Sequence, residues 1–342
     1  MAGNAMASAS RVDPPRRVEV HVTVTTNGAP FPEGTIVTLG VPGETFEGAD
    51  VPTDASGNAV LIAEFPPEVT IVSIDIPSII SWGPSEQVDV RNDAANLADK
   101  AFSLPSPRLI TLVPGQEIYT VDFFAPEAVS VRGRTVDGQG GFFPSHANRG
   151  GVFNLRFHPD SRGGFFEVFG VPKGQDSFLF LSMDRPDTHV VWLTAAQTGV
   201  DLDLGNVVVP TITSDAVVEI AVTGRNAVRS DLGVQNECVT LIHEDGLLVY
   251  TLKITEQGGV TTYPEGENDT ALPQVASGRY YIVPGMSNTS DSSLKALRLI
   301  RSGQRALLDA GGVPVIEPVS GQTTSGAIDL AAVQQIIDGL PE

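Results

Sequence analysis

Val18-Glu19-Val20-His21-Val22-Thr23-Val24 alternates apolar and polar residues along its whole length. Successive side chains of a β-strand point to opposite faces, so this stretch predicts a strand with one buried face and one exposed face. Asn27-Gly28 follows, a pair that is common in tight turns because both residues tolerate positive φ. Thr35-Ile36-Val37-Thr38-Leu39 then starts another strand pattern. The chain therefore opens as β-strands separated by tight turns.

The same succession of strand and turn restarts twice further along the chain. Strand patterns return at residues 129–136 and 216–223. Three segments also resemble one another as endings, each with a turn that contains Gln followed by a strand-like run; they are residues 113–122, 194–204 and 319–330. Because repetition of both openings and endings rarely arises by composition alone, it predicts tandem units.

The expected boundaries lie near Pro126 and between Pro210 and Asp215. A chain of 342 residues suits two or three cores, because single cores stop growing at roughly 250 to 300 residues. The predicted fold is all-β, with three tandem Ig-like or transthyretin-like β-sandwich units. The predicted parts are a flexible N-terminal segment at 1–17 and units at 18–126, 127–210 and 211–342.

The middle unit resembles a known family. The segments that carry the resemblance are Val131-Arg132-Gly133-Arg134-Thr135-Val136-Asp137-Gly138, residues 164–169, Val171-Pro172-Lys173-Gly174 and Leu202-Asp203-Leu204-Gly205. They resemble the carboxypeptidase regulatory-like family, whose members have a transthyretin-like β-sandwich of about seven strands and act as scaffolds or binding modules. The resemblance covers about residues 127–210, implies a fold, and carries over no catalytic residue.

Three segments have helical composition: 92–101, 291–309 and 328–340. In the last, Leu330, Val333, Ile336 and Ile337 fall on one face, so a short amphipathic helix competes with a terminal strand. Packing of that helix on its own unit is favoured over docking on another subunit.

Composition limits the partners. The formal charge is 21 − 41 = −20, which repels phosphate backbones and anionic membranes, so we expect no nucleic-acid partner. No apolar run approaches the roughly 20 residues of a bilayer span, which predicts no membrane insertion. The first ten residues lack a secretory-signal pattern. Cys238 is the single cysteine, so it cannot form an intramolecular disulfide and is expected to be a buried small hydrophobe.

Signatures of chemistry are absent from the sequence. The histidines lack metal-ligand spacing; they are His21, His146, His158, His189 and His243. No nucleophile elbow occurs, and Cys238 has no placed histidine partner. Asp50, Asp54, Ser56 and Asn58 superficially match a calcium loop, but the terminal glutamate is missing and an Asx-turn is favoured. We therefore predict no catalytic residue, no metal and no cofactor.

Aromatic residues supply the candidate contacts with a partner or ligand. Trp82 lies in a turn-rich context where its ring could be exposed, although a core position is favoured, whereas Trp192 lies in an apolar run and is expected in a core. The pairs Phe142-Phe143 and Phe165-Phe166 each place one ring on each face of a strand. Trp82, Phe142 and Phe143 are therefore the predicted contact residues.

These features favour a non-catalytic structural protein, most concretely a virion component of a bacterial virus: a minor tail, fibre-associated or capsid decoration protein. Such a protein would assemble in the host cytoplasm with other copies of itself and other structural subunits. The excess of 17 Arg over four Lys adds a weak hint of origin. The alternative is a cell-surface or extracellular protein that recognises a polysaccharide, such as one on a host surface. An accessory array for an enzyme on another chain ranks last.

Overall fold

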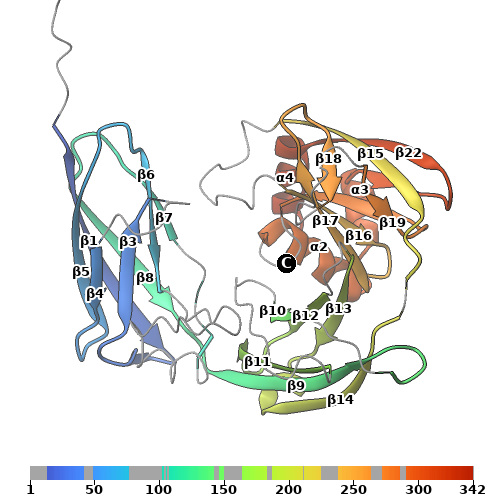
Figure 1. The fold of residues 1–342 in the computed structure, drawn as a ribbon. Coiled ribbons are helices and arrows are strands. Elements are labelled where there is room, and N and C mark those ends of the chain that lie inside the picture. The colour runs from blue at the N-terminus through green and yellow to red at the C-terminus, as the bar shows by residue number, and fades with distance from the viewer. Residues whose placement is uncertain are drawn as a thin grey trace, which may run out of the picture.

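The computed structural model describes residues 14–41, 49–76, 102–103, 105, 108–141, 146–149, 164–182, 187–210, 212–224, 238–262, 272–285 and 290–341. Within these residues the protein is all-β, built from three β-sandwich units in chain order, with helices only in the last unit apart from a single 3-10 turn (Figure 1). The predicted fold class is confirmed.

The first unit packs two sheets face to face. One sheet contains β1 (Arg16–Thr26), β2 (Ala29–Pro30), β5 (Asn58–Phe65) and β8 (Ile118–Phe124). The other has the order β4-β3-β6-β7, with β3 at Ile36–Gly40, β4 at Ala49–Pro52, β6 at Ile71–Asp75 and β7 at Arg108–Thr111. Alternate residues of β1 are buried, as its pattern predicts: Val18, Val20, Val22 and Val24. These valines join a core that contains residues of both sheets.

The strand β1 begins before the residue expected from its alternating pattern. It starts at Arg16, inside the segment predicted to be flexible. The Arg16 guanidinium donates to the carbonyls of Val113 and Gln116 and to the Tyr119 hydroxyl, the latter at 3.2 Å. The turn that precedes the last strand of the unit thus holds the first residue of β1 in place.

The middle unit combines a three-stranded sheet with part of a larger one. The small sheet has the order β11-β9-β14, with β9 at Ala128–Val136, β11 at Phe165–Pro172 and β14 at Leu202–Val208. Facing it are β10 (His146–Arg149), β12 (Ser177–Ser182) and β13 (Asp187–Leu193). A 3-10 turn at Gln197–Gly199 precedes β14.

The last unit adds helices to the same plan. Its small sheet has the order β19-β15-β22, with β15 at Ala216–Thr223, β19 at Gln274–Val275 and β22 at Thr323–Asp329. Its other strands are β16 (Cys238–His243), β17 (Leu248–Ile254), β18 (Val260–Thr262), β20 (Tyr280–Pro284) and β21 (Val315–Ile316). The helices are α2 (Asp291–Arg301), α3 (Ala306–Gly311) and α4 (Leu330–Gly339).

The helix α4 confirms the amphipathic pattern near the C-terminus. Leu330, Val333 and Ile337 are buried, and Ile336 packs partly buried against the same core. Asp329 caps the helix, because its side chain accepts a hydrogen bond of 3.0 Å from the amide of Ala332. The helix therefore packs on its own unit, as favoured. The helices α2 and α3 confirm the helical composition of 291–309, whereas 92–101 lies outside the described residues.

All three units share one topological rule. The opening strand pairs in parallel with the closing strand, although the rest of each unit separates them in sequence. The parallel pairs are β1 with β8, β9 with β14 and β15 with β22. The repeated openings and endings of the sequence are thus neighbouring strands in each sandwich, which is the spatial basis of the repeat.

The turn before each closing strand also repeats. In each unit the backbone amide of a glutamine donates to the carbonyl three residues earlier, which closes a β-turn. The bonds run from Gln116 to Val113 at 3.1 Å, from Gln197 to Thr194 at 2.9 Å, and from Gln322 to Val319 at 3.0 Å. The Gln-containing turns predicted from the sequence are therefore confirmed in all three units.

A glycine in the left-handed region marks a third repeated position. In each unit the amide of an opening-strand residue donates to the carbonyl of that glycine, and the glycine precedes a strand. The bonds are Val24 to Gly57, Thr135 to Gly164 and Val222 to Gly258, each 2.8 Å long. Gly57 has φ +75°, and a Cβ there would lie 2.4 Å from the carbonyl oxygen of Val24, so only glycine fits.

A shared sheet joins the middle and last units. The strand β13 of the middle unit pairs antiparallel with β17 of the last, which places both in one eight-stranded sheet. This β13–β17 seam pairs Asp187 with Tyr250, Thr188 with Val249 and His189 with Leu248. The boundary expected between Pro210 and Asp215 stays a prediction of where the chain passes from one unit to the next. Backbone pairing nevertheless crosses it.

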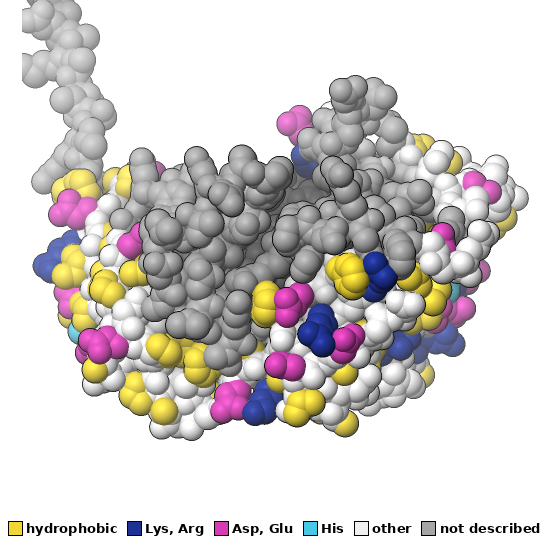
Figure 2. All heavy atoms as spheres, turned by 60° about the horizontal axis from the view of Figure 1, so that its bottom comes forward, with side chains coloured by type: hydrophobic (Ala, Val, Ile, Leu, Met, Phe, Trp, Pro, Cys, Tyr) yellow, Lys and Arg dark blue, Asp and Glu magenta, His cyan; other side chains and the backbone are white. Residues whose placement is uncertain are grey.

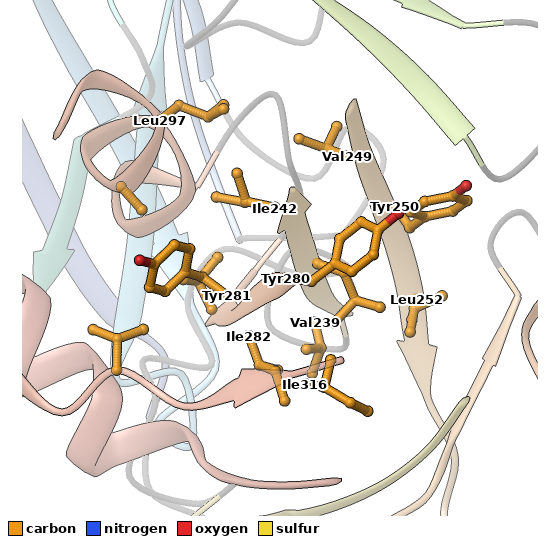
Figure 3. Packing of buried hydrophobic residues seen from close by; sticks show 14 of the residues in the cluster. Val239, Ile242, Val249, Tyr250, Leu252, Tyr280, Tyr281, Ile282, Leu297 and Ile316 are labelled. Carbon is orange, nitrogen blue, oxygen red and sulfur yellow. The ribbon is translucent and has the colours of Figure 1, made fainter. Parts of the chain in front are cut away.

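The core at this seam is also shared. Phe178, Phe180 and Val190 of the middle unit belong to the same buried cluster as the tyrosines of the last unit. Figure 3 shows Tyr250 and Tyr280 beside one another in this core, with ring centroids 5.9 Å apart in an edge-to-face arrangement. In contrast, the buried cluster of the first unit is separate. The middle unit also has a buried cluster of its own, which includes Leu179, Leu181 and Leu193, so it shares only part of its buried residues with the last unit.

Candidate functional site

The predicted contact residues Trp82, Phe142 and Phe143 lie outside the described residues, so their role stays a prediction. The other aromatic expectations can be checked. Phe166 is 3% exposed and Phe165 is 41% exposed, which confirms one ring on each face of β11. Trp192 is half-buried against the shared core, with its ring 4.9 Å from that of Phe178.

The exposed ring of Phe165 lies in an ordered array on the outer face of the β11-β9-β14 sheet. Strand register places two rows of three residues across this face. The rows are Phe165, Arg134 and Asn206, then Glu167, Arg132 and Asp203. An arginine of β9 is therefore central in each row.

This array lines a hollow of about 550 Å³, within the size range of small-molecule sites. Gly133, Phe166 and Gly205 complete its lining. The three strands lie at the bottom of Figure 1, and Figure 2 turns that side forward, where basic, acidic and hydrophobic side chains lie close together. We call this hollow and its two rows the β9 face.

Arg134 and Phe165 form the aromatic half of the β9 face. The guanidinium carbon of Arg134 lies 4.1 Å from the centre of the Phe165 ring, a cation–π contact that fixes both side chains. Beneath them, Gly133 leaves room for the buried ring of Phe166, because a Cβ on Gly133 would lie 2.7 Å from that ring. Glycine between the two arginines thus lets the outer side chains sit on a packed layer.

Arg132 and Asp203 form the polar half. The Nε of Arg132 donates to Oδ2 of Asp203 over 3.0 Å, and both side chains are more than half exposed. A bulge between Asp203 and Asn206 lets the amide of Gly205 donate to Oδ1 of Asp203 over 2.9 Å. The amide of Gly205 and then the guanidinium of Arg132 lower the pKa of Asp203, so its carboxylate is ionised at neutral pH.

The chemistry of the β9 face suits binding. It offers guanidinium donors, carboxylate acceptors and an amide beside an aromatic ring. Among the described residues no group of three or more His, Cys, Asp or Glu side chains could hold a metal ion.

Two side-chain expectations elsewhere in the chain are also settled. Asp54 Oδ1 accepts from the amides of Ser56 and Asn58 at 2.8 and 2.9 Å, which confirms the Asx-turn. Cys238 is buried, as expected.

Sequence reasoning missed most of the β9 face. The alternation of Val131-Arg132-Gly133-Arg134 places both arginines on one side of a strand, which was a usable signal. It could not place Asp203 opposite Arg132, since these residues lie far apart in sequence and their register depends on a bulge.

Comparisons with known proteins assign no family. No family model matches the chain, and no curated protein matches its sequence. Solved structures with a partial likeness include the TIE protein of Bacillus anthracis, at 13% identity and a TM-score of 0.23, covering 92% of this chain and 50% of that one. This chain therefore spans half the length of that protein.

Two pilins are also similar in part. The major pilin subunit BcpA of Bacillus cereus has 9% identity and a TM-score of 0.22, covering 92% of this chain and 99% of that one. The shaft pilin SpaA of Lactobacillus rhamnosus GG has 9% identity and a TM-score of 0.20, covering 58% and 98%. At these TM-scores the chains do not superpose as wholes, so the likenesses assign no function. In the part of the chain that the structure describes, no helix is long and apolar enough to cross a membrane.

Proposed function

We propose that this chain is a non-catalytic structural protein that assembles with copies of itself or with other structural subunits. The observation that carries the proposal is the β13–β17 seam, where backbone pairing and a common core fuse two units. A hydrogen-bonded ladder across a unit boundary opposes hinge motion, and a building block needs a fixed angle between its parts.

An apolar area on the first unit supports subunit contacts. Register places Ile62 and Ile118 on either side of Glu19 on the outer face of its sheet, with Val60 in the next row of β5. Val60, Ile62 and Ile118 are 44%, 48% and 57% exposed. Neighbouring exposed apolar residues on a highly acidic chain suit a contact with another subunit, since burial of this area would stabilise the complex.

The finer part of the proposal is that the assembly is the virion of a bacterial virus, with the chain as a minor tail, fibre-associated or decoration protein. Tandem sandwich units, the acidic composition and the arginine bias support it. A scaffold role of the middle unit, as the resemblance to carboxypeptidase regulatory-like proteins implies, agrees with the proposal.

Two experiments test these parts. Sedimentation velocity of the purified chain should show association that Ile118→Asp weakens and that Val200→Asp, a change at a 69% exposed site in the middle unit, leaves intact. A monomer at all concentrations would contradict self-assembly. For the virion, antibody-labelled electron microscopy of purified virus particles should show the chain at a fixed copy number. Detection only at the cell surface would favour the alternative.

A further inference from the structure

The β9 face combines a hollow with an exposed aromatic ring, two features that suit a small polar ligand. The hollow measures about 550 Å³, and Phe165 is 41% exposed. Because Arg134 stacks over that ring at 4.1 Å, the aromatic platform is ordered before any ligand arrives. An ordered platform loses little conformational entropy on binding.

Hydrogen-bonding groups surround the platform on the neighbouring strands. Glu167 and Asp203 present carboxylate acceptors, Arg132 and Arg134 present guanidinium donors, and Asn206 offers both. Hydroxyl groups can donate to the carboxylates and accept from the guanidinium groups. A ligand that carries several hydroxyl groups around an apolar ring face therefore matches this set of side chains.

Charge narrows the ligand class. The two arginines and the two acidic residues of the hollow balance one another, and the chain as a whole carries −20. A strongly anionic ligand would meet this overall field and would have to displace Asp203 from Arg132, which lies 3.0 Å from it. Uncharged ligands meet no such cost.

We infer that the β9 face of the middle unit binds a neutral saccharide, with the exposed part of the Arg134–Phe165 stack as its apolar contact and the paired charged side chains as partners of its hydroxyl groups. The site differs from the predicted contacts at Trp82, Phe142 and Phe143. The inference does not depend on the assembly proposal, because binding is measured on the purified chain and each can fail alone.

The test is calorimetric titration of the full chain with neutral hexose oligosaccharides, namely maltohexaose, cellohexaose and mannohexaose, and with an acidic hyaluronan hexasaccharide. At least one neutral probe should bind, and Phe165→Ala should weaken it at least tenfold. Phe124→Ala is the matched control, since Phe124 is also an exposed strand phenylalanine, at 54%, on the first unit. That control should keep full affinity.

Asp203→Asn provides a second variant that keeps the ring and the shape of the side chain. It should also weaken the neutral probe at least tenfold, because a carboxylate acceptor becomes an amide. Thermal melting of each variant confirms that it is folded. No binding of any neutral probe, equal affinity in Phe165→Ala, or tighter binding of hyaluronan would each overturn the inference.

Discussion

The backbone amide of Val190 donates a hydrogen bond of 2.9 Å to the carbonyl of Leu247. Val190 lies on β13 of the middle unit, and Leu247 lies in the turn before β17 of the last unit. The bond extends the β13–β17 ladder by one step and places the side chain of Val190 in the shared core. The two units therefore depend on one another for both backbone pairing and burial.

Cleavage between these two units should leave them together. A protease site inserted after Pro210 should give two fragments that co-elute on size exclusion after cutting, because the seam and the shared core still join them. The control is the same site inserted after Pro126, where the buried clusters on either side are separate, so those fragments should part. Separation after the Pro210 cut would contradict the fused sheet.

The seam should weaken in acid. Burial lowers the pKa of His189, the charge of Arg301 lowers it further, and Asp245 acts in the opposite direction. The folded chain thus favours the neutral imidazole of His189. Its contribution to the free energy of unfolding is therefore fully present above the unfolded pKa of about 6.5, and it is lost as the pH drops through and below that value.

The measurement is the urea midpoint of the full chain at pH 7.5 and pH 5. His189→Gln should lose less stability than the parent over this interval, and the exposed His21→Gln should behave as the parent does. An unchanged acid loss in His189→Gln would count against this origin.

Gly57→Ala should destabilise the first unit strongly. The substitution meets both a positive φ of 75° and a Cβ contact of 2.4 Å with the Val24 carbonyl, so we expect a loss of about 3 kcal/mol or more in the free energy of unfolding. Gly115→Ala is the control, since Gly115 has φ +82° with no atom within 4 Å of the added Cβ, and should cost about 1 kcal/mol. Equal losses by urea unfolding would show that the close contact is relieved.

Asp75 should give the first unit the opposite pH dependence. Burial raises the pKa of Asp75 from 3.8 to about 6, against a smaller effect of the Ile76 amide. The folded state therefore binds more protons, and stability falls as the pH rises from about 4 through 6.

Asp75→Asn should remove this dependence and stabilise the unit at pH 7 by ~2 kcal/mol, measured by urea unfolding. The exposed Asp122→Asn is the control and should have little effect. Destabilisation by Asp75→Asn at pH 7 would mean that the carboxylate is better solvated than its burial implies.

Local patterns in the sequence predicted the elements of this fold well. The alternation around Val20 gives β1 its buried face, and the Gln turns and the helix at Leu330 follow from chemistry within a few residues. Pairings between strands far apart in the sequence were harder to predict. Nothing in the apolar run around Tyr250 specifies Asp187 as its partner, because a strand with both faces buried carries no alternation that would fix its neighbour.

The candidate site divides in the same way. The outward ring of Phe165 follows from strand alternation, which is local. Its neighbours Arg134 and Asn206 come from two other strands, and the register that aligns them depends on the bulge after Asp203. Physical proximity across a sheet is set by the whole sandwich.

Parallel pairing of the first and last strands has a mechanical consequence. Since β1 and β8 run the same way, the chain enters the first unit at one pole and leaves it at the other, and the middle unit does likewise. Tension along the chain would pull the two strands past each other and load all their hydrogen bonds together in shear, instead of peeling them apart one by one. Units of this kind in a row should therefore resist mechanical extension.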